Sequence, residues 1–141
     1  MKGKQPYIVI ADDDEDDQLL VKHAIREIVD AEIESVYNGV ELLDLLKQQG
    51  KFKDRKSGTP DFILLDLNMP MLDGFGVLSR IKVDKILSEI PIYILSTSRM
   101  DHDKKRSKEL GASGFYTKPI LYDQLKAIIG EISSKHQRGG A

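Results

Sequence analysis

The sequence predicts an α/β protein built on a doubly wound parallel sheet of five strands. Five short runs rich in apolar and β-branched residues alternate with longer stretches whose apolar residues recur at helical spacing. The runs at residues 62–65 and 92–95 are apolar throughout, as expected of strands that helices cover on both faces. Alternating helices and strands of this kind are typical of a parallel sheet.

The strands are expected at residues 7–11, 33–37, 62–65, 92–95 and 113–116. The first run ends abruptly in acidic residues, and the second alternates apolar with polar residues. Pro91 comes directly before the fourth run and can open a strand. Gly111 comes shortly before the fifth run and indicates the end of the preceding helix.

The helices are predicted from apolar residues that lie three or four positions apart. The first follows the acidic residues 14–17, which suit the positive end of a helix dipole, and the second opens at Asn38-Gly39. The fourth, residues 101–110, is almost wholly polar. The apolar residues of the other four helices are Leu20, Ala24, Ile25, Ile28 and Val29; Val40, Leu42, Leu43, Leu45 and Leu46; Val77, Leu78, Ile81, Ile86 and Leu87; and Leu121, Leu125, Ile128, Ile129 and Ile132.

Length and composition favour a single soluble domain. The chain has 141 residues, and we expect an N-terminal extension at 1–5, one domain at 6–133 and a disordered tail at 134–141. The absence of cysteine excludes disulfides and thiolate metal sites, which agrees with a cytoplasmic protein. The 21 basic and 23 acidic residues argue against nucleic-acid binding, and the sequence offers neither a signal peptide nor a membrane span.

Polar residues follow four of the expected strands. Asp12 and Asp13 follow the first strand, Asp66 follows the third, Ser96 follows the fourth, and Lys118 lies just beyond the fifth. Because ligands of an open parallel sheet bind at the carboxyl ends of its strands, we expect these groups to converge at one edge.

This set of groups has a chemical logic. Clustered carboxylates raise one another's pKa unless a cation joins them, and Mg²⁺ is the natural occupant of a site made of oxygens. Asp66 could then act as a nucleophile that forms an acyl phosphate. Lys118 would neutralise charge on the transferring group, and the Ser96 hydroxyl would hydrogen-bond a phosphoryl oxygen.

Each feature also has an ordinary structural interpretation. Residues 12–17 could be a solvated helix start, and Asp66 could be a turn or N-cap residue. Ser96 could be a hydrogen-bonding loop residue, and a single Lys-Pro pair carries little information. Only their joint placement at four strand ends favours a site.

At these residues the sequence resembles the receiver domain of two-component response regulators, from about residue 7 to residue 132. The resemblance covers the acidic pair, the acceptor within Phe62-Ile63-Leu64-Leu65-Asp66-Leu67-Asn68-Met69-Pro70, and the Asp73-Gly74 that follows. It extends to the hydroxyl residue Ser96, the lysine Lys118 and the aromatic switch position Phe115. The loop at 50–59 is longer than in compact members and resembles stand-alone receivers that partner phytochrome-type or other sensor kinases.

The resemblance implies a flavodoxin-like (βα)5 fold with strand order 2-1-3-4-5 and a magnesium site. Asp13 and Asp66 would bind Mg²⁺ directly with the backbone carbonyl of Asn68, and Asp12 would act through water. Lys118 would contact the phosphoryl group.

It also implies a phosphorylation switch. Ser96 would move inward and Phe115 would turn toward the interior, which alters the surface formed by the fourth helix, fifth strand and fifth helix. Serine lacks the methyl group of threonine, and phenylalanine cannot hydrogen-bond as tyrosine would, so packing alone would carry the signal at Phe115.

The expected function is that of a single-domain response regulator, because no output domain follows. It would accept phosphate from the phosphohistidine of a sensor kinase or phosphotransfer protein and act on an unknown protein target, with a homodimer as a possible state. Self-phosphorylation and self-dephosphorylation would depend on Mg²⁺, without the turnover of a classical enzyme.

Three alternatives stay open. The first is a Mg²⁺-dependent phosphohydrolase, although such enzymes need a second carboxylate where this chain has Asn68. The second is a degenerate receiver that no longer takes phosphate. A dinucleotide-binding domain is less favoured, because no glycine-rich turn follows the first strand.

Overall fold

The computed structural model describes residues 5–55, 58–98 and 100–136. Its sheet has five parallel strands in the order β2-β1-β3-β4-β5, which confirms the predicted fold. The strands agree with the predicted ones to within one residue at each end. They are β1 (Tyr7–Ala11), β2 (Glu32–Val36), β3 (Phe62–Leu65), β4 (Ile92–Ser96) and β5 (Gly114–Thr117).

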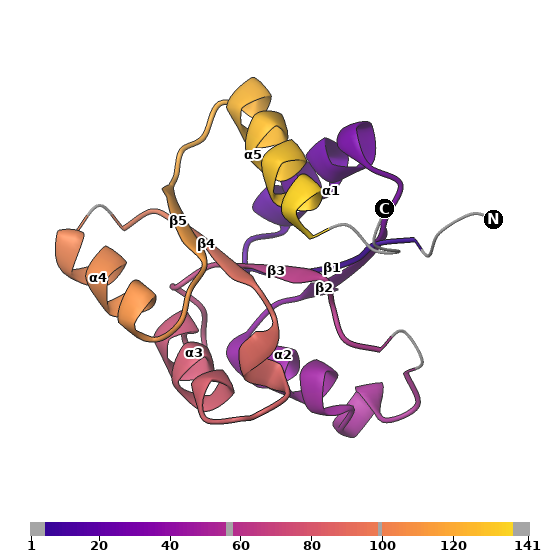
Figure 1. Ribbon diagram of the computed structural model, residues 1–141, viewed down its shortest axis with the longest axis vertical. Coiled ribbons are helices and arrows are strands. Elements are labelled where there is room, and N and C mark those ends of the chain that lie inside the picture. The colour runs from indigo at the N-terminus through magenta and orange to yellow at the C-terminus, as the bar shows by residue number, and fades with distance from the viewer. Residues whose placement is uncertain (1–4, 56–57, 99, 137–141) are drawn as a thin grey trace.

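Helices cover both faces of the sheet (Figure 1). Helices α1 (Glu15–Ile28) and α5 (Tyr122–Lys135) lie side by side on one face. Helices α2 (Gly39–Lys47) and α3 (Gly74–Lys82) lie on the other face, and α4 (Asp101–Glu109) lies beside the edge strand β5. Each face therefore has its own hydrophobic layer, as in a doubly wound sheet.

The side chains of β1 show how one strand serves both layers. Tyr7, Val9 and Ala11 pack in the layer under α2 and α3, whereas Ile8 and Ile10 pack under α1 and α5. Successive side chains of a strand point to opposite faces, so a strand covered on both faces must be apolar at every position. This requirement explains the continuous apolar runs of the sequence.

The buried face of α1 differs from the predicted one. Leu20 and Ile28 are 44% and 42% exposed, whereas Gln18 and Val21 are buried. The Gln18 side-chain amide donates to three backbone carbonyls at the ends of β1 and β2, namely those of Ile10 (3.1 Å), Asp12 (3.0 Å) and Val36 (2.9 Å). A polar residue occupies a core position here because its amide group hydrogen-bonds buried backbone carbonyls at the strand ends.

The third predicted helix was too long. Helix α3 ends before Ile86, which is 71% exposed, and Leu87 belongs to a separate 3-10 turn, η2 (Leu87–Glu89). The Asp84 side chain accepts from the backbone N–H groups of both residues and starts that turn. Two other residues assigned to apolar stripes, Val40 and Leu121, are also exposed.

The expected tail also began too early. Helix α5 continues through Lys135, and the His136 Nε2 atom lies 2.7 Å from the Tyr93 hydroxyl oxygen. The His136 ring also packs 6.1 Å from the ring centroid of Phe62. Residues 134–136 are therefore part of the folded domain, while 137–141 and most of the expected extension at 1–5 lie outside the described residues.

The loop before β3 is attached to the edge of the sheet. It contains the 3-10 turn η1 (Gly50–Phe52), in which Phe52 is buried. Arg55 pairs with Glu34 and the Tyr7 hydroxyl, and its guanidinium lies 5.0 Å from the Tyr7 ring centroid. Residues 56 and 57 lie outside the described part. In the ranges that are described, no helix has the length and apolar character needed to cross a membrane.

Candidate functional site

The predicted site residues meet at the carboxyl edge of the sheet. Backbone hydrogen bonds tie the ends of neighbouring strands together there, because Asp66 N–H donates to the Ala11 carbonyl at 2.9 Å and Lys118 N–H donates to the Ser96 carbonyl at 2.8 Å. Asp12 and Ser96 are buried at this edge, at 4% and 0% exposure. The sheet register thus places side chains from distant parts of the sequence next to one another.

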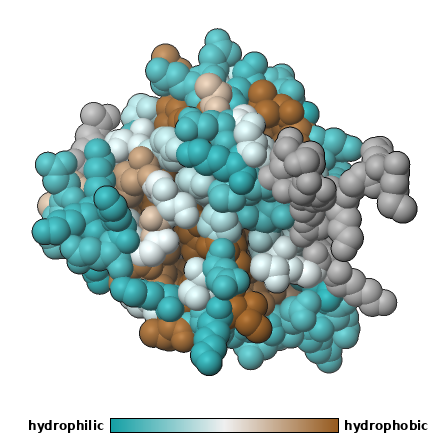
Figure 2. Space-filling view, in the orientation of Figure 1, coloured by the Kyte–Doolittle hydropathy of each residue, from teal (hydrophilic) through white to brown (hydrophobic). Residues whose placement is uncertain are grey.

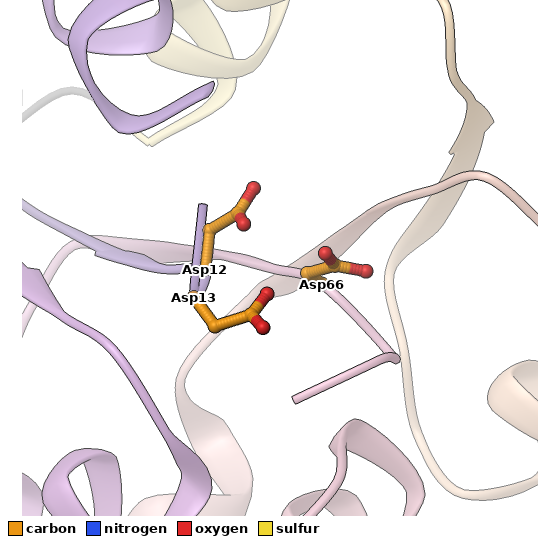
Figure 3. A group of neighbouring side chains, drawn as sticks. All are labelled: Asp12, Asp13 and Asp66. Carbon is orange, nitrogen blue, oxygen red and sulfur yellow. The ribbon is translucent and has the colours of Figure 1, made fainter. Parts of the chain in front are cut away.

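Three carboxylates form a cluster at this edge. Asp12 and Asp13 come from the end of β1 and Asp66 comes from the end of β3 (Figure 3). One oxygen of each lies within 4.8 Å of the others. Asp13 is exposed, whereas the side chain of Asp66 is only 12% exposed. Asp66 Oδ1 accepts a hydrogen bond of 3.1 Å from Asn68 N–H, which turns the chain directly after the strand.

The cluster fits a hard divalent cation. Oxygens that bind one Mg²⁺ at about 2.1 Å lie at most about 4.2 Å apart, so the three carboxylates need only a small adjustment to share an ion. Among the residues that the structure describes, this is the group of acidic side chains with the spacing of a metal site. Asp12, Asp13 and Asp66 would therefore be the protein ligands nearest to such an ion.

Lys118 reaches into the site from the loop after β5. Its Nζ donates to Asp12 Oδ2 at 2.8 Å and to Asp17 Oδ2 at 2.9 Å, and it lies 3.6 Å from Asp66 Oδ2. Its side chain is only 14% exposed. The ammonium group is therefore close to the candidate nucleophile, but its two short hydrogen bonds go elsewhere.

Burial shifts the ionisation of these groups. It raises the pKa of Asp12 and of Asp66; the Lys118 hydrogen bond opposes the shift at Asp12, and the Asn68 N–H and the Lys118 charge oppose it at Asp66. Burial alone would lower the pKa of Lys118, but its hydrogen bonds to Asp12 and Asp17 and the charge of Asp66 outweigh burial and raise it. The lysine stays charged, and the carboxylates gain from every cation brought near them.

The two expected switch residues lie on adjacent strands. The Ser96 hydroxyl is buried at the end of β4 and accepts from Ser98 N–H at 3.3 Å. Phe115, on β5, is partly buried against the layer under α2 and α3, and the Lys104 ammonium lies 5.9 Å from its ring centroid. The sequence alone did not reveal this contact between α4 and the aromatic residue.

The Asp73-Gly74 pair shapes the loop that carries Asp66. Asp73 caps α3, since its side chain accepts from Gly76 N–H at 2.9 Å. Gly74 N–H donates to the Leu67 carbonyl at 2.9 Å. A Cβ atom at position 74 would lie 2.8 Å from Leu67 Cα and 2.9 Å from the Asp66 carbonyl oxygen. Only glycine lets α3 approach the loop that carries Asp66 this closely.

Asp17 is a site residue that the sequence analysis did not identify. Asp14 caps α1, because its side chain accepts from Asp16 N–H at 2.8 Å and Asp17 N–H at 3.1 Å. This cap places Asp17 in the first turn, where its carboxylate meets Lys118. From the sequence, residues 14–17 are expected only to offset the helix dipole, and only Asp12 and Asp13 are expected in the site. No local signal in the sequence indicates that Asp17 meets Lys118, because the two residues lie 101 positions apart.

The family model for the response regulator receiver domain matches residues 8–130. Response regulator Rcp1 of Synechocystis sp. is 35% identical over 125 residues, which cover 87% of this chain and 84% of Rcp1. The phosphorylated cyanobacterial phytochrome response regulator RcpA is 34% identical, with a TM-score of 0.84 and 94% of each chain covered. The Mn²⁺-bound form of Rcp1 is 32% identical, with a TM-score of 0.80, 92% of this chain and 78% of that chain covered. The chain belongs to the response regulator receiver domain family of two-component signalling.

Proposed function

We propose that this receiver domain takes a phosphoryl group onto Asp66 from the phosphohistidine of a sensor histidine kinase or phosphotransfer protein. An Asp66 carboxylate oxygen forms a P–O bond as the P–N bond of the phosphohistidine breaks. The imidazole keeps the electron pair of the broken bond and takes up a proton. The observation that carries this proposal is the position of Asp66, with Asp12 and Asp13 on one side and the Lys118 ammonium 3.6 Å away.

The same residues support a requirement for Mg²⁺. When bound, the ion would supply positive charge that offsets the charge of the transferring phosphoryl group. Asp12, Asp13 and Asp66 would hold it together with the backbone carbonyl of Asn68. Lys118 would hydrogen-bond the phosphoryl oxygens, because its buried ammonium stays charged. The domain would thus catalyse its own phosphorylation and dephosphorylation, without turnover of a separate substrate.

A chain of hydrogen bonds supports a route from the phosphoryl group to α4. Ser96 Oγ accepts from Ser98 N–H, and Ser98 Oγ donates to Asp103 Oδ2 at 2.5 Å. Movement of Ser96 toward the phosphoryl group would therefore pull on the loop that enters α4. Among the α4 residues only Ser107 is buried, and hydrophilic side chains cover this helix (Figure 2). A helix with so little apolar anchoring costs little to displace.

The surface formed by α4, β5 and α5 would carry the signal to a protein target. A groove of about 530 Å³ lies there, and its lining includes Lys104, Phe115, Ile120 and Ile128. If Phe115 turns inward, the shape of the groove changes and the contact with Lys104 is lost.

A homodimer through α5 and β5 belongs to the same proposal. Light scattering with and without beryllofluoride tests whether the domain dimerises.

Intact mass spectrometry after incubation with phosphoramidate and Mg²⁺ tests the proposal. We expect one added phosphoryl group on the wild type, and none on Asp66→Asn or after chelation of the metal. Hydrogen exchange with beryllofluoride tests the switch, and we expect it to change in residues 101–109. A wild type that gains no phosphoryl group and shows no exchange change with beryllofluoride would contradict phosphorylation and favour a degenerate receiver.

A further inference from the structure

We propose that Asp17 is a positioning residue for Lys118, which holds the ammonium group until a phosphoryl group arrives; this inference rests on the proposed function. The two short hydrogen bonds of Lys118 Nζ go to Asp12 at 2.8 Å and to Asp17 at 2.9 Å, while Asp66 lies 3.6 Å away. To form a short hydrogen bond to a phosphoryl oxygen on Asp66, Lys118 must exchange one of these partners.

Burial decides which partner Lys118 gives up. The Asp12 side chain is only 6% exposed, so water has little access to replace a hydrogen bond that its carboxylate loses. The Asp17 side chain is 39% exposed, and water can replace the lysine at its carboxylate. Exchange at Asp17 is therefore the less costly change, and Asp12 remains paired throughout.

Asp17 and Lys118 also line a cavity next to helices α1 and α5. The cavity has a volume of about 280 Å³, and its other lining residues are mainly apolar, among them Leu20, Leu95 and Leu125. The cavity lies between α1, the end of β4 and the start of α5. When Lys118 leaves Asp17, an uncompensated carboxylate remains at the edge of this apolar cavity. Phosphorylation would thus alter this surface as well as the surface formed by α4, β5 and α5.

The proposed exchange predicts whether a substitution of Asp17 raises or lowers the affinity for a phosphoryl analogue. In Asp17→Asn the contact that Lys118 must break is no longer an ion pair, because the amide carries no charge, so an analogue of the phosphoryl group should bind more tightly. A partly exposed ion pair is worth up to about 1 kcal/mol, which corresponds to roughly a fivefold change in affinity.

Asp16→Asn is the matched control, since Asp16 is exposed in the same turn of α1 and loses the same charge. Asp17→Glu keeps the charge and should return the affinity toward that of the wild type. Circular dichroism melts of all variants show whether each one folds.

The experiment measures beryllofluoride affinity by calorimetry at saturating Mg²⁺, and the Lys118 ammonium signal by ¹⁵N NMR without ligand. We expect Asp17→Asn to bind beryllofluoride roughly fivefold more tightly than Asp16→Asn, and to be the variant that shifts the ammonium signal. If the two variants bind beryllofluoride with equal affinity while the wild type binds it normally, the role of Asp17 is overturned but the proposed function is not. A wild type that binds no beryllofluoride would overturn the proposed function and this inference with it.

Discussion

Replacement of Gly74 by alanine tests the close approach between α3 and the acceptor loop. The added methyl group would meet the Leu67 Cα atom at 2.8 Å and the Asp66 carbonyl oxygen at 2.9 Å. Both are backbone atoms, so the helix or the loop must move. Overpacking of this kind costs about 1–3 kcal/mol, which for a domain of this size lowers the melting temperature by about 3–10 °C. Urea unfolding followed by circular dichroism measures the loss directly.

Gly76→Ala is the matched control for this substitution. Its methyl group would lie 2.5 Å from Leu72 Cδ1, the end of a side chain that can rotate away. Alanine is also favoured over glycine in a helix by up to about 1 kcal/mol, so Gly76→Ala should be neutral or stabilising. Gly74→Ala should in addition slow phosphorylation, because it displaces the loop that carries Asp66. Equal stability of the two variants would refute the reasoning, since the contacts at position 74 would then carry no cost.

Three further predictions follow from other buried or clustered groups. Gln18→Met should cost about 1–3 kcal/mol of unfolding free energy in urea, because it removes three hydrogen bonds to buried carbonyls; an unchanged midpoint would contradict this role. Burial, and to a lesser extent the Lys135 charge, lower the pKa of His136 in the folded protein. Below a pH of about 6.5 the unfolded chain therefore binds more protons than the folded one, and stability should fall as the pH drops. His136→Gln should reduce that slope, and an unchanged slope would exclude His136 as its source. Mg²⁺ at ten times its dissociation constant should stabilise the wild type by about 1.4 kcal/mol, and Asp13→Asn should lose most of that gain in a thermal melt; an equal gain would exclude Asp13 as a ligand.

The sheet could be predicted well because its strands are covered on both faces. Every position of β1 and β3 is buried, so the sequence there is apolar without interruption and its limits are sharp. The polar residues that follow the predicted strands include Asp12, Asp66 and Lys118, and the structure brings these three together.

The parts that could not be predicted depend on polar residues in buried positions. Gln18 occupies the core face of α1, so apolar spacing alone predicts a buried face that wrongly includes Leu20. His136 follows the last residue of α5 and contacts Tyr93, which lies 43 positions away in the sequence. Asp17 contacts Lys118 across 101 positions, and no local pattern of residues encodes such a pair.

The most direct test of Asp66 as the acceptor is chemical identification of the phosphorylated residue. Borohydride reduces an aspartyl phosphate to homoserine, which peptide mass spectrometry can locate after phosphorylation with phosphoramidate and Mg²⁺. We predict homoserine at position 66 and unmodified aspartate at positions 12, 13 and 17. Homoserine at one of those positions, or a phosphorylated protein with unmodified Asp66, would contradict the assignment of Asp66 as the phosphoryl acceptor.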